Sequence, residues 1–508
     1  MFSDKSVVNK LVKCCESMTL QHVVLCPGSR NVPLILSFDG SKSFDCTTIV
    51  DERSAGFFAI GCSQFSGKPT AIVCTSGTAV LNFAPAIAEA YYQHIPILVI
   101  TADRPAEWID KGDGQTIRQE KIYANYCDYS FLLTEETERH TLSELYRLLV
   151  VEKYQGPIHV NVPLSEPLYN TIEQNNEIFE YQGNINSDSE ESQILKLSSK
   201  RLLILPINSP REINLKIQSL LKNTVVFSEH GSNVFCEEGL HFLSSEQVEQ
   251  LMLDAKANKF FVPEDVITVD GTILSKELKI YLRKNKPKRH IHLTDSTFAP
   301  DVFGVGVERF SLKTEFEYES LDRTFVDFWT KSVEQKKIGF TLDQFLPSKC
   351  NLQIANSTPI RDIQKWKLTP LQKVFCNRGT NGIEGSMSTA VGFAYASRNT
   401  TDLTIHITGD LSFFYDSNAL WFNKITSNLR IILINNRGGN IFRKIGKMLP
   451  SEILENRLCA NQNLTAEFIA KTFDIQYVSA KTEEEIATYL QSVFFQPSSK
   501  PILLEIFE

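Results

Sequence analysis

The chain has 508 residues, of which 42% are hydrophobic and 22% charged, a composition typical of folded globular proteins. This length is too great for one ordinary hydrophobic core and predicts about three domains, at roughly 150 residues each. The net charge of -8, from 60 acidic and 52 basic residues, and the lack of a sustained basic block argue against nucleic acid as the main partner.

The N-terminal sequence MFSDKSVVNKLVKCC has no long apolar run, so we expect no signal peptide. No stretch of the chain approaches 18 consecutive apolar residues, which predicts no stable membrane insertion. The eleven cysteines are odd in number and contain no C-x-x-C pair, a pattern that favours reduced thiols over disulfides or a zinc site. We therefore expect a cytoplasmic protein.

Short apolar runs alternate with helical patterns in the first 170 residues, the first predicted domain. This alternation predicts a parallel sheet flanked by helices. The predicted strands are residues 23–26, 70–74, 95–101 and 157–162, and a helix is predicted over residues 77–93. Residues 171–200 are polar and are interpreted as a linker.

The rest of the chain is predicted to form a central domain over residues 201–330 and a last domain over residues 345–508. The central domain has predicted strands at 202–205, 224–227, 260–262, 266–269 and 290–293, and the last has them at 352–355, 403–408, 429–434 and 502–506. No internal repeat is visible at the level of residues. The predicted fold class is α/β, with three doubly wound parallel-sheet domains.

Two polar dipeptides in the last domain follow predicted strands. Gly409–Asp410 and Asn435–Asn436 both fall at the carboxyl edge of the same predicted sheet, where such folds bind ligands. An Asp carboxylate, an Asn amide oxygen and a backbone carbonyl suit magnesium, and Gly438 and Gly439 allow a diphosphate to approach the backbone. Either dipeptide alone also fits a simple turn. Together they resemble the GDG…NN signature of thiamine-diphosphate enzymes, with Leu411 in place of the third glycine.

Such an enzyme also needs a carboxyl group beside the aminopyrimidine ring of the cofactor, to favour its imino tautomer. Glu52, in IVDERSAGFFAIG, ends a predicted strand and opens a predicted helix in the first domain. The alternative is an acid in the first turn of a helix, stabilised by the helix dipole.

The complete set of loop motifs is more specific than either feature. Its members are CPGSRNVPL (26–34), DERSAGFFAIG (51–61), TSGTAVLNFAPAIAEAYYQ (75–93), TADRPAE (101–107), GDGQTIRQ (112–119), ANSTPIRD (355–362), NRGTNGIEG (377–385), the Gly409–Asp410 segment and NNRGGNIF (435–442). In this order and spacing they resemble the 2-succinyl-5-enolpyruvyl-6-hydroxy-3-cyclohexene-1-carboxylate synthase family. The resemblance covers nearly the whole chain and is weakest in the central domain.

The resemblance implies a fold of the thiamine-diphosphate-enzyme type, with pyrimidine-binding, central and diphosphate-binding domains and active sites between subunits. It implies thiamine diphosphate and magnesium, with manganese as an alternative, as cofactors. The metal ligands that it implies are the Asp410 and Asn436 side chains and the Gly438 carbonyl. The implied cofactor-binding residues are Glu52, Thr75, Gly77, Ile383, Gly409, Asp410, Leu411, Ser412, Asn436, Gly438, Gly439, Ile441 and Phe442.

The implied substrates, 2-oxoglutarate and isochorismate, are dicarboxylates, which arginine recognises through bidentate contacts. The resemblance implies substrate-binding roles for Arg30, Arg104, Gln115, Lys276, Ser357, Arg361 and Arg378, and catalytic roles for Glu52, Ser29, Arg30, Gln115 and Arg378. Any one of these arginines taken alone also fits a surface ion pair. Gly114 precedes Gln115 where some relatives carry a polar amide.

The implied activity is a thiamine-diphosphate-dependent transferase reaction of menaquinone biosynthesis. In it 2-oxoglutarate is decarboxylated, and the resulting succinyl carbanion equivalent adds 1,4 to isochorismate. The alternatives are an acetolactate-synthase-like carboligase or decarboxylase and a non-catalytic homologue. A Rossmann dehydrogenase is a further option, but GVGV at residues 304–307 is only a fragment of a dinucleotide loop.

Overall fold

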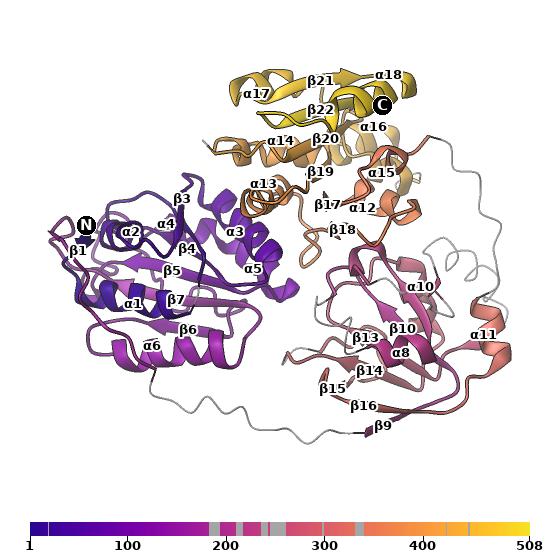
Figure 1. Cartoon of the computed structure of the whole chain (residues 1–508), viewed down its shortest axis with the longest axis horizontal. Helices are drawn as coiled ribbons and strands as arrows, with labels where there is room; N and C mark the ends of the chain where they lie inside the picture. The colour runs from indigo at the N-terminus through magenta and orange to yellow at the C-terminus, as the bar shows by residue number, and fades with distance from the viewer. Residues whose placement is uncertain are drawn as a thin grey trace.

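The computed structural model of the chain contains three separate six-stranded parallel sheets flanked by helices (Figure 1). It describes residues 1–18, 20–181, 194–209, 217–234, 242–243, 261–296, 299–330, 340–422, 424–445 and 448–508. In Figure 1 the first domain lies at the left, the last at the top and the central one at the lower right. The predicted α/β class with three doubly wound sheets is confirmed.

The first sheet has the strand order β3-β2-β4-β5-β7-β6. Its central strands are fully buried because helices cover both faces, so they read as continuous apolar runs. The strands are β2 (His22–Leu25), β3 (Asp45–Thr48), β4 (Thr70–Cys74), β5 (Ile97–Asp103), β6 (Tyr129–Leu132) and β7 (Pro157–Pro163). The helices are α1 (Ser6–Ser17), α2 (Val32–Gly40), α3 (Glu52–Ser66), α4 (Thr78–Asn82), α5 (Ala84–Gln93) and α6 (Glu138–Tyr146).

The last sheet repeats this arrangement, in the order β18-β17-β19-β20-β22-β21. Its strands are β17 (Cys350–Ile354), β18 (Gln372–Phe375), β19 (Thr404–Gly409), β20 (Leu429–Asn435), β21 (Gln476–Ala480) and β22 (Ile502–Phe507). Its helices are α12 (Thr358–Asp362), α13 (Ser386–Ala396), α14 (Asp410–Tyr415), α15 (Asn440–Ile445), α16 (Ser451–Ile453), α17 (Glu467–Thr472) and α18 (Glu483–Tyr489). The four strands predicted here from sequence are confirmed within two residues.

The central sheet has a different order, β12-β11-β10-β13-β14-β15. Its strands are β10 (Arg201–Leu205), β11 (Val225–Ser228), β12 (Phe242–Leu243), β13 (Asp265–Val269), β14 (Arg289–Leu293) and β15 (Glu308–Phe310), and its helices are α8 (Gln218–Asn223), α10 (Lys276–Lys284) and α11 (Arg323–Trp329). The GVGV fragment precedes the edge strand β15, and the Asp301 carboxylate accepts hydrogen bonds from the backbone N–H groups of Gly304, Val305 and Gly306. A neighbouring side chain therefore caps this loop.

Two local predictions are wrong. The helix predicted over residues 77–93 is two helices, α4 and α5, because Pro85 has no N–H to continue a helix and opens the second one instead. The strand predicted at 260–262 is absent from its described part, since Phe261 has a 3-10 helical conformation and its carbonyl accepts a hydrogen bond from Trp329 Nε1. Residue 260 lies outside the described residues.

Part of the predicted linker packs on the first domain. β8 (Thr171–Ile172) pairs antiparallel with β1 (Phe2–Ser3), and the Tyr181 ring stacks on Tyr146. After the undescribed residues 182–193, β9 (Ile194–Leu197) pairs in parallel with β16 (Glu315–Tyr318) of the central domain. The described part of the segment thus belongs to the domains on either side.

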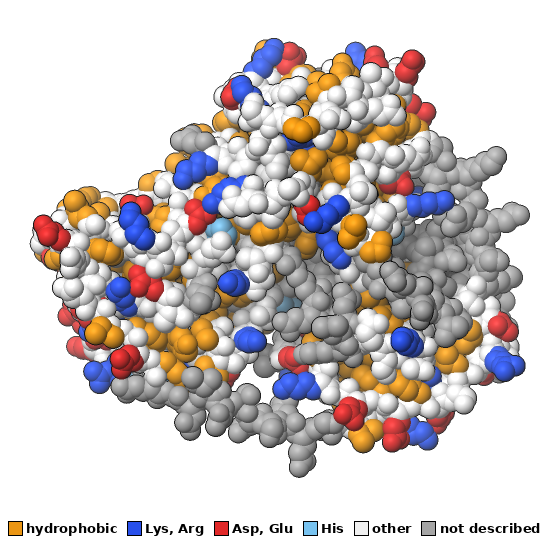
Figure 2. Space-filling model, viewed as in Figure 1, with side chains coloured by type: hydrophobic (Ala, Val, Ile, Leu, Met, Phe, Trp, Pro, Cys, Tyr) orange, Lys and Arg blue, Asp and Glu red, His pale blue; other side chains and the backbone are white. Residues whose placement is uncertain are grey.

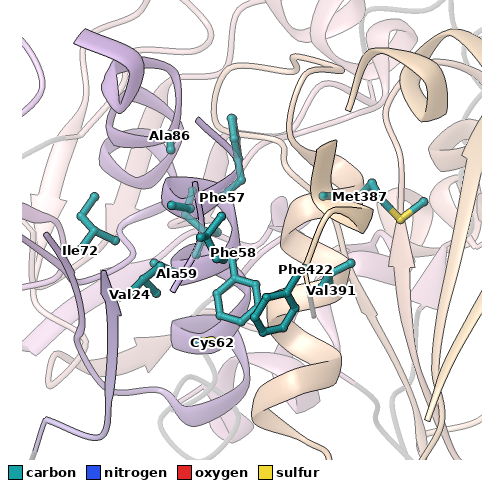
Figure 3. Packing of buried hydrophobic residues seen from close by; sticks show 14 of the residues in the cluster. Val24, Phe57, Phe58, Ala59, Cys62, Ile72, Ala86, Met387, Val391 and Phe422 are labelled. Atoms are coloured by element: carbon teal, nitrogen blue, oxygen red, sulfur yellow. The ribbon is translucent and has the colours of Figure 1, made fainter. Parts of the chain in front are cut away.

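The first and last domains meet where α3 crosses α13 (Figure 3). Two glycines allow the backbones to touch: a Cβ atom on Gly61 would lie 2.0 Å from Thr389 O, and one on Gly392 would lie 2.0 Å from Phe58 O. Around them, Phe58 packs edge-to-face on Phe422. This crossing fixes how the first and last domains pack on each other within one chain.

The carboxyl edge of the central sheet contacts the last domain. Asn208, after β10, donates to the carbonyl of Cys376, and Thr272, after β13, donates to the carbonyl of Arg378. The Figure 2 view shows acidic and basic side chains interspersed over the three domains. None of the described helices is long and apolar enough to span a membrane. The ten cysteines in the described part of the chain are all unpaired.

Candidate functional site

The predicted site residues lie in loops at the carboxyl ends of the strands of the first and last sheets. Because the strands of each sheet are parallel, the loops that follow them gather at one edge. In the last sheet, β19 ends at Gly409 and β20 ends at Asn435, and the two strands are direct neighbours. The predicted metal ligands therefore come together.

The Asp410 carboxylate is buried and held by three donors. Its Oδ1 accepts from Leu411 N at 2.8 Å, and its Oδ2 accepts from Gly438 N and from Gln462 Nε2, both at 2.7 Å. The amide oxygen of Asn436, by contrast, is buried and has no hydrogen-bond partner among the described residues. A buried acceptor without a donor is costly unless a ligand satisfies it. A carboxylate beside such an oxygen fits a hard divalent cation.

The loop after β20 needs its glycine. Gly438 has φ +141°, and a Cβ atom there would lie 2.6 Å from Cys459 O. Arg443 ties the loop to the following segment, because it donates to Asn436 O, to Glu455 and to Asn461 Oδ1. Ile441 and Phe442, predicted to face the cofactor, lie on α15 directly after this loop and are partly exposed.

The loop that carries Ile383 is bound to α14. Ser412 Oγ donates to Ile383 O at 3.0 Å and also contacts Ser386 Oγ at 2.7 Å. Ser412 lies two residues after Asp410 on the same short helix. Four predicted cofactor residues, Ile383, Asp410, Leu411 and Ser412, are thereby brought together.

Glu52 is the first residue of α3, where the Asp51 side chain caps the helix by accepting from Arg53 N and Ser54 N. Glu52 Oε2 accepts a hydrogen bond from Asn82 Nδ2 at 3.2 Å, and the carboxylate is partly exposed. Thr75 Oγ1 is buried without a partner among the described residues. Gly77 donates to Gln119 Oε1 at 2.9 Å, which orders the loop after β4.

Glu52 and Asp410 make no direct contact with each other in the described part of the single chain. What joins their two helices is structural: Arg53 Nη2 donates to Tyr415 O, and Asp416 Oδ1 lies 3.7 Å from the same guanidinium. Asp416 is fully buried and accepts from Ser388 N and Oγ, and burial raises the pKa of its carboxyl to about 7.

Arg30 and Arg104 form a first basic group on the first domain. Arg30 is 4% exposed; it donates to Leu164 O at 2.9 Å and lies 3.2 Å from Glu166 Oε1, while Arg104 donates to Gly114 O. Burial, with a contribution from Arg104, lowers the pKa of Arg30. The Nε atoms of both arginines are buried and lack partners among the described residues. Two adjacent cations with unused donors form a site suited to an anion.

Ser29 and Gln115 lie beside this group and are both exposed. Gln115 has φ +56°, and its carbonyl accepts from Ser76 Oγ at 2.8 Å, so the loop holds the residue with its side chain at the surface. Ser29 immediately precedes Arg30 in the loop between β2 and α2. The structure thus brings together Ser29, Arg30, Arg104 and Gln115, which are the residues of the first domain that were predicted to act on substrate.

Arg361 and Arg378 form a second basic group on the last domain. Arg378 is 7% exposed and donates to Asn356 Oδ1 at 3.1 Å, and its Nε lacks a partner among the described residues. Arg361 donates to Ser357 O. Burial, with a contribution from Arg378, lowers the pKa of Arg361. Ser357 has φ +74°, a conformation rare for residues other than glycine that is typical of functional loops.

On α10, Lys279 rather than Lys276 approaches this second group. Lys276 is exposed at the first residue of the helix. Lys279 lies one turn later, and burial lowers its pKa, with Arg378 and Arg361 acting in the same direction and Glu229 opposing them. The fully buried Glu229 accepts from Leu274 N and Ser275 N, and burial raises its pKa to about 7.

Four further residues support the site but were not singled out from sequence. Asn356 donates to the carbonyls of Asn377 and Gly382 and so connects the loops of Arg378 and Ile383. Glu89, buried on α5, accepts from Gly379 N, Thr380 N and Thr380 Oγ1. The other two are Gln462 and Lys279. The only sequence signal for Asn356 and Glu89 was their place inside quoted motifs.

Comparison with known proteins identifies the family of the chain. Residues 5–122 match the family model "Thiamine pyrophosphate enzyme, N-terminal TPP binding domain". The chain is 37% identical to the 2-succinyl-5-enolpyruvyl-6-hydroxy-3-cyclohexene-1-carboxylate synthase of Flavobacterium psychrophilum, over 99% of this chain and 96% of that protein. It is 35% identical to the synthase of the same name from Bacteroides fragilis (100% and 97%) and 33% to that of Porphyromonas gingivalis (99% and 95%). The chain therefore belongs to the 2-succinyl-5-enolpyruvyl-6-hydroxy-3-cyclohexene-1-carboxylate synthase family of thiamine-diphosphate enzymes.

Proposed function

We propose that this protein decarboxylates 2-oxoglutarate and joins the remaining succinyl unit to isochorismate by 1,4-addition, giving the product that names its family. The observation that carries the proposal is that the buried Asp410 carboxylate and the orphaned amide oxygen of Asn436 follow neighbouring strands, with one basic group at the carboxyl edge of the same sheet and a second at that of the first sheet. A metal–diphosphate site and two anion sites are what this reaction needs.

Asp410, Asn436 and the Gly438 carbonyl would hold magnesium or manganese, and the metal would hold the diphosphate of the cofactor. Bound thiamine diphosphate supplies an acidic thiazolium carbon and a ring that accepts the electron pair released with carbon dioxide. Gly438, with no Cβ, lets the loop approach the diphosphate, and Ile383, held by Ser412, would support the cofactor between its two rings.

Glu52 would hydrogen-bond the pyrimidine ring and hold a proton there, which favours the imino tautomer of the cofactor's amino group. Its place at the capped N-terminus of α3 gives the carboxyl group a fixed direction. Ser29 and Gln115, exposed beside Arg30, would orient the acceptor substrate. The protein otherwise supplies orientation and positive charge.

The two basic groups would each take one dicarboxylate. Arg361 and Arg378, with Ser357, would bind 2-oxoglutarate, while Arg30 and Arg104 would bind isochorismate. Fixed guanidinium groups with unused Nε donors recognise carboxylates in a bidentate manner. Lys276 was predicted to assist, and the surroundings of Lys279 favour the residue one turn further on.

We also propose that the complete site forms between two copies of the chain. The support is the family resemblance, which implies active sites between subunits. Mixing two inactive variants, Glu52→Gln and Asp410→Ala, tests this arrangement, because a mixed dimer would contain one site with both native groups. Activity of roughly a quarter of the native value is expected after subunit exchange. No recovery, despite exchange shown by mass spectrometry, would contradict a shared site.

The reaction itself is tested by ultraviolet absorbance, which follows the loss of isochorismate in the presence of thiamine diphosphate and magnesium. Consumption is expected with 2-oxoglutarate but not with pyruvate, and it should collapse in Glu52→Gln. If folded, cofactor-loaded protein consumes no isochorismate, the proposed substrate pair is wrong. Product formed equally well with pyruvate would instead indicate an acetolactate-synthase-like enzyme.

A further inference from the structure

Gln462 lies just beyond η8 (Leu454–Leu458) and touches both polar strand ends of the proposed metal site. Its Nε2 donates to Asp410 Oδ2 at 2.7 Å and to Asn435 Oδ1 at 3.1 Å. Its Oε1 accepts from Leu464 N, and its backbone N–H donates to Arg437 O. The side chain is therefore held from both ends and cannot turn its donor away from Asp410.

The hydrogen bonds to Asp410 are divided unequally between its two oxygens. Each carboxylate oxygen has about two lone pairs. Oδ2 already accepts two donors, Gly438 N and Gln462 Nε2, while Oδ1 accepts only Leu411 N. One lone pair remains free, and it is on Oδ1.

We infer that Gln462 is a positioning residue that determines metal specificity, because it fills Oδ2 and restricts Asp410 to ligation through Oδ1 alone. Magnesium takes single oxygens in a strict octahedron, whereas calcium accepts both oxygens of one carboxylate. Blocking the second oxygen thus favours magnesium and manganese over calcium. This inference rests on the proposed metal site of Asp410, Asn436 and Gly438.

Of the two donors to Oδ2, only Gln462 is a side chain and open to substitution. Gln462→Leu and Gln462→Met both remove the Nε2 donor at similar size, and Oδ2 then regains a lone pair. Gln462 is partly exposed, so either variant should fold. The matched control is Asn463→Leu, the same change at the exposed next residue.

The experiment measures thiamine diphosphate binding to the full-length protein by calorimetry, with magnesium chloride or calcium chloride in parallel. In both Gln462 variants, the thiamine-diphosphate dissociation constant measured with calcium, divided by that measured with magnesium, should fall roughly tenfold, the size typical of lost hydrogen bonds to a metal ligand. The ratio should be unchanged in Asn463→Leu.

The ratio of the thiamine-diphosphate dissociation constants with the two metals distinguishes metal selection by Gln462 from a merely structural role. Local disorder would weaken cofactor binding equally with both metals and leave the ratio unchanged. Equal weakening, or an unchanged ratio in both Gln462 variants, overturns the inference while leaving the proposed function intact. If native protein binds thiamine diphosphate with neither metal, the proposed cofactor site itself is wrong.

Discussion

The first and last domains have the same strand order but carry different chemistry at matching strand ends. The loop after β4 has Thr75 and Gly77 where the loop after β19 has Asp410, and β5 leads to Arg104 where β20 leads to Asn436. The loop after β3 provides Glu52, and the loop after β18 provides Arg378. One topology thus offers equivalent positions, and the residues placed there would decide, under the proposed function, whether a domain binds the pyrimidine ring or the diphosphate of the cofactor.

The largest expected effect is a difference in kcat between substitutions in the two matching loops, one after β19 and the other after β4. Asp410→Ala should lower kcat about 10³-fold and abolish magnesium-dependent cofactor binding, because the metal loses an anionic ligand. Thr75→Ala, at the equivalent strand end, should lower kcat less than about tenfold, since Thr75 offers only an uncharged hydroxyl. Turnover at saturating substrate and calorimetric binding measure both. Equal losses would show that the two loops are not specialised.

A second substitution breaks the contact between the domains. Gly61→Ala should lower the free energy of unfolding by about 3 kcal/mol, because the new methyl group would lie 2.0 Å from the backbone oxygen of Thr389. Urea denaturation followed by fluorescence measures the change. Gly114→Ala is the control, since a Cβ atom there meets nothing within 4 Å. An unchanged unfolding midpoint in Gly61→Ala would contradict the close helix crossing.

Replacing an arginine of one basic group by lysine should weaken binding only of the substrate that this group holds. Arg378→Lys is expected to raise KM for 2-oxoglutarate roughly tenfold, and Arg30→Lys to raise KM for isochorismate by a similar factor, because lysine cannot form the bidentate contact. Each variant should leave KM for the other substrate within about twofold. Steady-state kinetics with each substrate varied in turn checks the assignment, and crossed effects would reverse it.

A last effect, on stability, concerns Asp416, between α13 and α3. Burial raises the pKa of its carboxyl to about 7, so between about pH 4 and 7 the folded protein holds a proton that the unfolded chain has released. The contribution of the Asp416 carboxyl group to the free energy of unfolding is at its full value below pH 4 and is lost as the pH rises towards 7. Asp416→Asn should flatten the dependence of unfolding free energy on pH by on the order of 2 kcal/mol between pH 5 and 7. Denaturation curves at several pH values measure it; parallel slopes would contradict the assignment.

The sequence was sufficient to predict the parts of the fold in which local pattern and burial agree. Buried strands such as β4 and β20 are continuous apolar runs that end in polar turns, so both the strands and the loops at their ends were predictable. The break before Pro85 was missed because the apolar pattern of residues 77–93 continues through it. The predicted strand at 260–262 was short and apolar, a pattern that does not distinguish a strand from an irregular buried segment.

Residues that act through distant partners could not be predicted in this way. Gln462 contacts an aspartate 52 residues earlier, and nothing in its own surroundings indicates that contact. Lys276 and Lys279 lie one turn apart on α10, and the helical period alone does not say which of them approaches the arginines. Such roles depend on how the domains pack, which is a property of the assembled chain.

The buried carboxylate of Glu89 has a consequence for synthesis of the chain on the ribosome. Its partners in Gly379 and Thr380 lie 290 and 291 residues later in the sequence. At roughly 5–20 residues per second, the nascent first domain waits about 15–60 s before they emerge. During that time Phe57, Phe58 and Glu89, on α3 and α5, lie on a surface that the last domain does not yet cover, and exposed apolar surface of this kind makes unfinished chains prone to aggregate.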